Sequence, residues 1–477
     1  MPNRSALGWL SLLLSIAFFV AFYWTGLDAW FYQDDFGWLN LRHDLAGWSD
    51  LPGILFRPLA HGNVRPWSER APFLLFPLLF GMDPLPFRIL AFLTQAANLV
   101  LLWMIVFRLT NSLAAAALAP LLWTLNPGLA PAMYWSSIYN QILSTFFLLL
   151  PFWFLLCAID TGQRRWWIWQ WAAFIAGFGA LETNVVYPAL AALYVLACAR
   201  QHLRSVAPMF LASALYAAIH FVAAPLDKSG VYALHFDAGL MTRLATYWNW
   251  ALGGVFFVTA ILTAAAAGFL TSRMVRREWA VAALSAWFVI VLAPMLPLRD
   301  HRMDYYLAGP AAGIGFLGGF AWAAAGRSSR FWRAVAAAAL LAYAIPSGIA
   351  ARRVAGWHYA RSRATANLVL GVAEVRRQNS GKVILITGVD TDLFRAGVAH
   401  APFRAFEIPD VWLAPGSEKA IADPRDFVRL YVRPAERAVE EVEENRAVVV
   451  DVSRSWVRNV TGYYRPNARA LWLAFSL

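Results

Sequence analysis

Charged residues are scarce in this sequence of 477 residues: Asp, Glu, Lys and Arg together make up 14%, whereas hydrophobic residues make up 60%. The mean hydropathy is positive. Soluble globular domains are about 25% charged, so the composition excludes that class. The chain is therefore expected to lie mostly within a membrane.

Cysteine is almost absent, because Cys157 and Cys198 are the only two in the chain. They make neither a disulfide framework nor a metal site. The sequence also lacks a Walker loop, a dinucleotide-binding glycine pattern, a metal motif and a nucleophile elbow. Nucleic-acid binding has no support, because no basic patch is interleaved with aromatic residues.

Apolar runs of about 20 residues, the length that a helix needs to cross the hydrocarbon core, recur along the first 350 residues. Barrel strands would give short alternating segments instead, so we predict a bundle of about eleven transmembrane helices. The predicted spans are residues 7–25, 88–108, 113–127, 138–158, 166–180, 184–199, 205–224, 246–270, 279–296, 305–325 and 331–349. The first is interpreted as a retained helix, because large aromatic residues rather than a cleavage site follow it.

Arginine is unevenly distributed between the two ends of these spans. With the N-terminus inside, the inner turns receive Arg4, Arg108, Arg164, Arg165, Arg200, Arg204, Arg273, Arg276, Arg277, Arg327, Arg330 and Arg333. The short outer loops receive Lys228, Arg243, Arg299 and Arg302. The positive-inside rule therefore predicts a cytoplasmic N-terminus and an extracytoplasmic C-terminal region. This topology also accounts for much of the net charge of +12.

Two regions outside the spans differ from the rest. The first outer loop, residues 26–87, is long and rich in proline. Its short apolar stretches, Leu51–Phe56 and Phe73–Phe80, are predicted to be interfacial or re-entrant helices. Residues 351–477 have no apolar run of membrane length and carry many charges. We therefore predict a transmembrane domain over 1–350 and a soluble extracytoplasmic domain over 351–477.

The C-terminal region alternates between helical and β-type patterns, which predicts a small α/β domain. Helices are predicted at 362–378 and 434–445, and strands at 382–387, 427–432, 447–452 and 470–475. The predicted fold class is thus a mostly α, polytopic membrane protein with a small C-terminal α/β domain.

Acidic side chains before residue 351 lie almost entirely on the outer side. Asp160 and Glu278 are inner, whereas the outer group is Asp28, Asp34, Asp35, Asp44, Asp50, Glu69, Asp83, Glu182, Asp227, Asp237, Asp300 and Asp304. The outer side also carries His43, His61, His235 and His301. Part of this bias reflects the longer outer loops. Even so, an inner active site would have almost no acid–base groups, so chemistry is predicted at the outer face.

Asp34 and Asp35 directly follow the first span. Adjacent side chains diverge on a helix and on a strand, so the two are not expected to share one task. One carboxylate can act as a general base or bind a divalent cation, while the other caps a helix or orients its neighbour. The alternative is that Asp34 only caps an interfacial helix beginning near Phe36.

Glu182 lies at an outer helix junction among apolar residues. An ionisable group at membrane depth costs about 2.5–3.5 kcal/mol on insertion scales, so it usually faces a cavity or a partner. Glu182 is therefore a candidate substrate-binding residue. The alternative is a solvated turn residue that caps the next helix.

Arg299, His301 and Arg302 stand together at another outer junction, followed by Tyr305. Arginine offers paired donors to phosphate oxygens, so this cluster is predicted to hold a phosphate group of the substrate. The alternative is a surface loop whose arginines pair with the neighbouring aspartates.

In the first outer loop, His61 suits substrate contact together with Asn63 and Arg65. The segment from Trp135 to Gln141 suits packing as well as it suits contact with a substrate. His220, inside a predicted helix, is interpreted as a core histidine.

Taken in order, these features resemble the polytopic lipid-dependent glycosyltransferases of the GT-C fold, particularly the protein O-mannosyltransferase-like branch. An acidic pair opens the first outer loop of that family, as Asp34 and Asp35 do here. Three later segments resemble its His-Pro, Lys-Glu and Arg-Tyr-Leu-Tyr-Leu-Pro motifs: Asn126-Pro127 with Tyr134–Ser137 and Asn140, Leu181–Thr183 with Tyr187-Pro188, and Arg302–Leu307 with Pro310. The resemblance covers residues 1–325. Asn126 replaces the expected histidine and Leu181 the expected lysine, and both departures concern substrate contacts.

The resemblance implies a sugar donor carried on a polyprenyl phosphate and an acceptor that is a glycan, a lipid or a protein. Asp34, or else Asp35, would deprotonate the acceptor hydroxyl for a single inverting displacement. Arg299, His301 and Arg302 would neutralise the phosphate that leaves, and Glu182 would orient the donor or the acceptor. Some relatives use a divalent cation such as Mg²⁺ or Mn²⁺, for which Asp34 and Asp35 are the obvious ligands.

Two other functions compete with this interpretation. A transporter or flippase of lipid-linked sugars would explain charged helix junctions, but it predicts inverted repeats and polar residues near the bilayer midplane. The third function is a non-catalytic membrane scaffold that recruits partners through its outer domain. A bacterial inner membrane is the default location, because the N-terminus is short and no eukaryotic sorting signal is seen.

Overall fold

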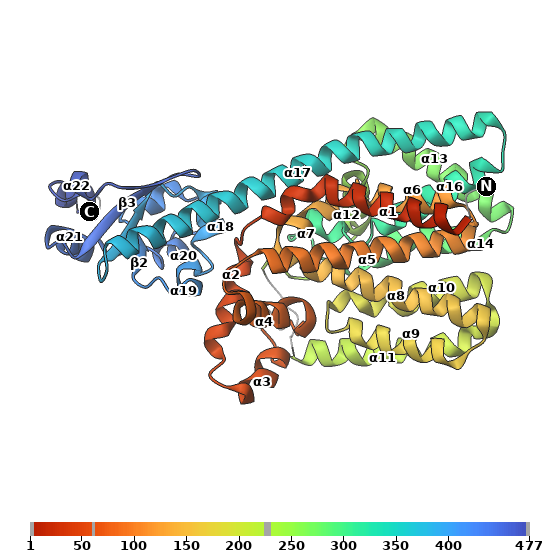
Figure 1. Cartoon of the computed structure of the whole chain (residues 1–477), viewed down its shortest axis with the longest axis horizontal. Coiled ribbons are helices and arrows are strands. Elements are labelled where there is room, and N and C mark those ends of the chain that lie inside the picture. Colours follow the sequence, from red (N-terminus) through yellow and green to blue (C-terminus); the bar gives the residue numbers. More distant parts are fainter. Residues whose placement is uncertain (1–3, 60–62, 224–229, 474–477) are drawn as a thin grey trace. The chain divides into compact units, whose positions relative to one another are not determined.

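A computed structural model describes residues 4–59, 63–223 and 230–473 of the chain, and these residues are mostly helical (Figure 1). They group into two compact units. The bundle unit comprises Met1–Leu27, Leu51–Pro72 and Phe87–Gly356, and the sheet unit comprises Asp28–Asp50, Phe73–Pro86 and Trp357–Leu477. The start of the first outer loop is thus grouped with the C-terminal region. A domain boundary at residue 350 stays a prediction.

The bundle unit contains, wholly or in large part, α1 (Arg4–Tyr23), α3 (Leu51–Phe56), α5 (Leu85–Thr110), α6 (Leu113–Thr124), α7 (Ala130–Tyr134), α8 (Tyr139–Thr161), α9 (Arg164–Gly177), α10 (Tyr187–Cys198), α11 (Leu203–Ala223), α12 (Gly239–Ala251), α13 (Phe256–Val275), α14 (Trp279–Ser285), α15 (Trp287–Leu292) and α16 (Ala312–Gly326). Like α5, the helices α4 (Ala71–Phe80) and α17 (Arg330–Gln378) contribute residues to both units. Helices α8 and α9 lie side by side, and so do α6 and α16 (Figure 1).

Six helices among the described residues are long and apolar enough to cross a membrane: Ala6–Asp28, Leu85–Thr110, Ser136–Thr161, Arg200–Ala223, Phe256–Val275 and Arg330–Gln378. A seventh span would be the pair Leu113–Thr124 and Pro127–Tyr134, which is bent by 63°. Shorter apolar helices are Glu182–Cys198, Trp279–Met295 and Ala312–Gly326. Helical segments thus occupy all of the predicted spans, but several are shorter or more bent than a simple span.

The predicted span over 246–270 is wrong as one continuous helix. The chain breaks between α12 and α13, where Gly253 and Gly254 have φ values of 92° and 76°. A β-carbon on Gly253 would lie 2.8 Å from the backbone of Pro346 and Ser347. Only glycine adopts this conformation at so close an approach, so the glycine pair ends α12. Sequence hydropathy does not register such a break, because the residues on both sides are apolar.

The prediction of separate helices at 331–349 and 362–378 is also wrong, because α17 runs through both as one helix of 49 residues. The composition becomes more charged after residue 350, which favours the end of a transmembrane helix at that point. The intervening residues include no proline, and Gly356 retains helical geometry. One helix therefore continues from the apolar segment into the charged segment without a break.

The sheet unit has a four-stranded sheet in the order β2-β1-β3-β4. The strands are β1 (Val383–Thr387), β2 (Val411–Leu413), β3 (Ala447–Val452) and β4 (Val457–Asn459). β1 pairs in parallel with β2 and β3, whereas β4 is antiparallel to β3. Its helices are α2 (Asp34–Leu39), α18 (Thr391–Gly397), α19 (Pro402–Ala405), α20 (Arg425–Arg429), α21 (Ala435–Glu443), α22 (Thr461–Tyr464) and α23 (Ala468–Trp472).

The first halves of two predicted strands, 427–432 and 470–475, are helical instead, although Val432 forms an isolated parallel bridge with Leu413. Residues 425–429 form α20, and Phe427 and Tyr431, which are four residues apart, both pack against Phe394. Residues 468–472 form α23, in which Ala468 and Trp472 are both buried at the same helical spacing. Residues beyond 473 lie outside the described part. Short apolar runs fit both periods, and tertiary packing decided between them.

Candidate functional site

Asp34 and Asp35 open the short helix α2, and their side chains diverge as adjacent residues must. The Asp34 side chain is 45% exposed, whereas Asp35 is fully buried. The Asp35 carboxylate accepts a hydrogen bond of 3.3 Å from the backbone N–H of Tyr32. The two carboxylates therefore have different environments, one accessible to a substrate and the other buried within its own turn.

The residue before the pair has an unusual backbone conformation. Gln33 has φ 56° and ψ −126°, which costs a residue with a side chain about 1–3 kcal/mol. Its N–H donates to the carbonyl oxygen of Ala396 at 2.7 Å, and its side-chain oxygen accepts from Arg361 at 3.2 Å. Arg361 is in turn paired with Asp392. Residues of the C-terminal region of the sheet unit thus fix the turn that presents Asp34.

A histidine that the sequence did not single out faces Asp34. The Nε2 atom of His400 lies 3.5 Å from Oδ1 of Asp34. Burial, followed by the positive charge of Arg361, lowers the pKa of His400 below its ordinary value. A neutral imidazole beside a carboxylate can orient it or exchange a proton with it. No sequence signal pointed to this residue, because the contact joins positions 34 and 400.

The acidic pair does not offer a good site for a divalent cation. Magnesium and manganese sites need several oxygen or nitrogen ligands around one point. Asp34 and Asp35 point apart, and no group of three His, Cys, Asp or Glu side chains suited to a metal occurs within the described residues. The two carboxylates alone therefore do not complete a metal site, and their role as metal ligands stays a prediction.

In the bundle unit, Glu182 is not a solvated turn residue. It begins the short helix η7 (Glu182–Val186), and both of its oxygens accept hydrogen bonds from Nε of Arg65 at 3.0 and 2.9 Å. Arg65 also forms an ion pair with Oε1 of Glu69. The same oxygen accepts a hydrogen bond of 2.7 Å from the side-chain amide of Asn140. One arginine thus joins two carboxylates from distant parts of the chain. We call these four residues the Arg65 network.

The Arg65 network is built on an unusual turn. Residues Pro66–Arg70 form a π-helical turn, a conformation that is enriched at functional sites. Ser68 and Trp67 fix this turn to the segment before Glu182, because Ser68 donates to Ala180 at 2.7 Å and the Trp67 N–H donates to Gly179 at 3.0 Å. Glu69 is the member that sequence reasoning left unassigned. Its position four residues after Arg65, on a helical turn, was the available signal.

The predicted phosphate cluster is open and partly self-paired. Arg299 and Asp300 are about half exposed and bonded to each other at 3.2–3.3 Å. These hydrogen bonds from Arg299 hold the pKa of Asp300 below its ordinary value. His301 lies 3.3 Å from the hydroxyl of Tyr305 and packs against Tyr232. Arg302 is exposed, and within the described residues no ion pair or side-chain hydrogen bond engages it.

Two further predicted positions have different outcomes. His61 lies outside the described residues. Asn126, which replaces the histidine of the family motif, is fully buried and donates to Ala251 at 2.8 Å and to Tyr343 at 3.2 Å. Its oxygen accepts from the N–H of Gly128 at 3.0 Å. Asn126 therefore connects α12 and α17 to the turn after α6. The asparagine that replaces the family's histidine thus has hydrogen-bond partners of its own in the core.

Comparison with known proteins finds one family and several solved structures that resemble this chain. Residues 72–225 match the family of dolichyl-phosphate-mannose-protein mannosyltransferases. No curated protein sequence matches the chain significantly. The matched segment contains Glu182 but neither Asp34 nor Arg302, so it does not test the roles of those two residues.

Three solved structures share the fold. ArnT from Cupriavidus metallidurans, bound to undecaprenyl phosphate, superposes with a TM-score of 0.51 at 13% identity, covering 97% of this chain and 95% of that one. The apo oligosaccharyltransferase from Archaeoglobus fulgidus gives 0.53 at 12% identity, covering 93% and 69%. AglB from the same organism, with an inhibitory peptide and a dolichol-phosphate, gives 0.52 at 13% identity, covering 94% and 70%.

At these identities the solved structures show the fold, and the family match, which spans about a third of the chain, indicates a glycosyltransferase. The chain has the polytopic membrane fold of these structures, which is the GT-C fold. The resemblance and the fold class predicted from the sequence are therefore confirmed, including the small C-terminal α/β region.

Proposed function

We propose that this enzyme transfers a sugar from a polyprenyl phosphate to an acceptor hydroxyl, with inversion, at the extracytoplasmic face of a bacterial inner membrane. The observation that carries the proposal is the asymmetry of the acidic pair: Asp34 is exposed on a fixed turn while Asp35 is buried. The reported ligands of the similar structures, undecaprenyl phosphate in ArnT and dolichol-phosphate in AglB, support a polyprenyl carrier. The arginine distribution supports the proposed orientation.

In the proposed reaction Asp34 is the general base. Its carboxylate accepts the proton of the acceptor hydroxyl as the acceptor oxygen attacks the anomeric carbon. The bond from that carbon to the phosphate oxygen breaks, and the polyprenyl phosphate leaves with the electron pair. Displacement from the opposite face inverts the anomeric configuration. His400, 3.5 Å from Asp34, is proposed as a positioning residue for the base.

The leaving phosphate needs positive charge rather than a proton donor. Arg302 is the best candidate in the predicted cluster, because no ion pair or side-chain hydrogen bond engages it within the described residues, whereas Arg299 is bonded to Asp300. His301 and Tyr305 lie beside it in sequence and can add hydrogen bonds. Glu182 is saturated by Arg65, so we propose that it shapes the site rather than contacting the donor directly.

A divalent cation could take part in the proposed reaction, since a solved oligosaccharyltransferase from Archaeoglobus fulgidus is a complex with zinc and sulfate. In this chain Asp34 would be the first ligand to consider. A cation there would lower the pKa of the acceptor hydroxyl and neutralise phosphate charge. His400 lies beside Asp34, but no third His, Cys, Asp or Glu side chain joins the two within the described residues.

The test is release of polyprenyl phosphate by the purified full chain from a panel of lipid-linked sugars. Asp34→Asn should lower turnover about 10²–10⁴-fold, the usual contribution of a general base. Asp50→Asn is the matched control, because Asp50 lies in the same loop and, among the described residues, its carboxylate accepts hydrogen bonds from the local backbone at Ala46 and Gly47 alone. The anomeric configuration of the product, from NMR, tests inversion, and added chelator tests the cation.

Full turnover by Asp34→Asn would reject Asp34 as the base. Binding of donor by both proteins without turnover of any donor would instead favour a transporter of lipid-linked sugars.

A further inference from the structure

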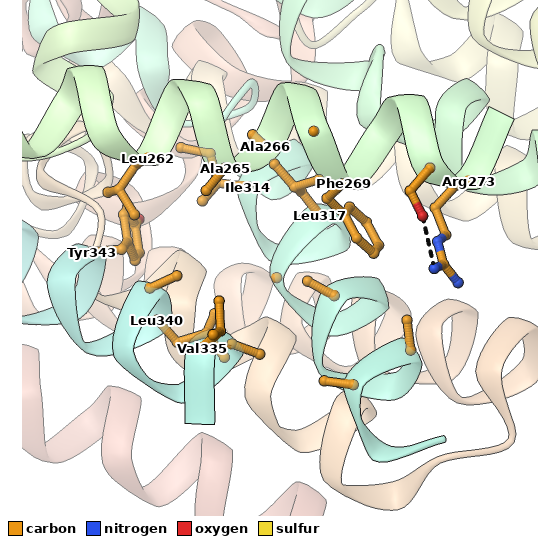
Figure 2. A pocket seen from close by; sticks show the side chains of 18 of the residues that line it. Leu262, Ala265, Ala266, Phe269, Arg273, Ile314, Leu317, Val335, Leu340 and Tyr343 are labelled. Carbon is orange, nitrogen blue, oxygen red and sulfur yellow. Dashed lines mark hydrogen bonds between the residues drawn. The ribbon is translucent and has the colours of Figure 1, made fainter. Parts of the chain in front are cut away.

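The bundle unit contains a long apolar groove that the proposed chemistry does not use. Helices α13, α16 and the start of α17 face one another across it, as Figure 2 shows for Leu262, Ile314 and Tyr343. Its volume is about 520 Å³. Small residues, including Ala265 and Gly268, line its middle and leave the space open. We call this cavity the α13 groove.

The two ends of the α13 groove differ in charge. One end, at Leu262 and Tyr343, is apolar with a single hydroxyl. The other end carries Arg273 and Arg276, and Figure 2 shows Arg273 at that end. Arg273 is bonded to Glu278 and to Ser272, while its buried Nε has no hydrogen-bond partner in the described structure. The exposed Arg276 side chain takes part in no ion pair or hydrogen bond there.

Within the bundle unit, this polar end lies far from Arg302. α16 begins just after the short helix η10 (Asp304–Leu307), which follows Arg302, and it ends at Gly326 beside the arginine end of the groove. The groove thus runs along α16 from the predicted outer end to the predicted inner end.

We propose that the α13 groove binds an anionic phospholipid of the inner leaflet, with one acyl chain along α13 and its phosphate at Arg276. The lining from Leu262 to Arg276 corresponds to about 21 Å of helix, close to the roughly 20–22 Å of one leaflet with its headgroups. The positive end complements a phosphate, and basic pockets between transmembrane helices on the cytoplasmic side are known to favour anionic headgroups.

Two other occupants fit less well. An apolar partner helix would match the apolar lining but would bring no negative charge to Arg276 at the end of the groove. A polyprenyl donor would have its phosphate at the outer end, where the groove is lined by Leu252 and Tyr343 rather than by arginine.

The experiment is native mass spectrometry of the purified full chain equilibrated with equal amounts of dioleoyl phosphatidylglycerol and dioleoyl phosphatidylcholine. Wild type should retain the phosphatidylglycerol preferentially. Arg276→Gln should lower that preference about fivefold, as expected for one arginine near a membrane surface. Arg164→Gln is the matched control, because Arg164 is exposed at the predicted inner end of another helix.

A second pair of variants tests the groove itself. A β-carbon on Gly268 meets no atom within 4 Å, so Gly268→Leu fills the groove without moving the backbone. It should abolish retention of phosphatidylglycerol, whereas Ala267→Leu, on an exposed position of the same helix outside the groove, should not. Unfolding temperatures of both variants confirm that they fold.

Three results would overturn the proposal. They are equal retention of both phospholipids by wild type, loss of bound polyprenyl phosphate instead of phosphatidylglycerol in Gly268→Leu, and a change of oligomeric mass in that variant. Since the readout is bound lipid rather than turnover, the outcome is independent of the proposed reaction.

Discussion

The Arg65 network and the segment from Arg299 to Tyr305 both bring arginine to the predicted outer side of the bundle unit, yet their surroundings are opposite. Arg65 is held by two carboxylates, Glu69 and Glu182, on a turn fixed by backbone hydrogen bonds. Arg302 is exposed, and within the described residues its side chain forms no ion pair and no hydrogen bond. The difference in surroundings suggests a structural role for Arg65 and a substrate-binding role for Arg302. A saturated arginine maintains a shape, whereas an arginine without partners is available to a substrate phosphate.

The strongest way to break this comparison is to remove Arg65. Arg65→Gln leaves the carboxylates of Glu69 and Glu182 without their cation. Losing one partner of a buried ion pair costs about 3–5 kcal/mol, and the partial exposure of Arg65 and Glu182 makes this an upper limit. We expect a large fall in unfolding temperature, measured for the full chain in detergent. A variant as stable as wild type would show that the network is well solvated, and then Arg65 would become a candidate substrate ligand.

Arg302→Gln should have the opposite effects: little change in stability and weaker binding of the donor. Its stability should stay within about 0.5 kcal/mol of wild type, since it replaces an exposed side chain without partners. Loss of a charged hydrogen bond to phosphate should weaken donor binding by about 1.5–3 kcal/mol. Donor titration measures this loss. Arg299→Gln is the control, because Arg299 is bonded to Asp300, and equal losses for both variants would contradict the distinction.

The smallest expected effect is a pH dependence in the sheet unit. Burial and the charge of Arg361 lower the pKa of His400, even with the Asp34 carboxylate 3.5 Å away. A histidine with a lowered pKa in the folded state stabilises the fold above its ordinary pKa, and this contribution is lost as the pH falls toward the lowered value. Wild type should therefore lose stability below about pH 6.5 more steeply than His400→Gln. Parallel unfolding temperatures from pH 7.5 to 5 would contradict this sign.

Much of the fold followed from the sequence, because apolar runs and the arginine pattern act over whole helices. The strand Ala447–Val452 was predicted to the residue, since a compact run of valines suits no exposed helix. The break at Gly253 and Gly254 was missed because it depends on the backbone of Pro346. Phe427 was placed in a strand because its helical partner Phe394 is distant in sequence.

The candidate site was predictable residue by residue but not in its pairings. Glu182 and Arg65 were each singled out, but no local pattern joins positions 117 apart in the chain. His400 was missed for the same reason, and Glu69 was missed although its spacing from Arg65 was visible. Sequence reasoning therefore identified chemical groups well and failed to show which of them neutralise one another.

The turn at Gln33 also has a consequence for the order of synthesis. Its partner Arg361 lies 328 residues later, and Ala396 and His400 later still. The ribosome therefore produces Asp34 early, while the residues that set its position come from the last quarter of the chain. A nascent chain that has already inserted its first helices carries the carboxylate without its final geometry. The acidic pair can therefore reach its final geometry only after the C-terminal region has been synthesised.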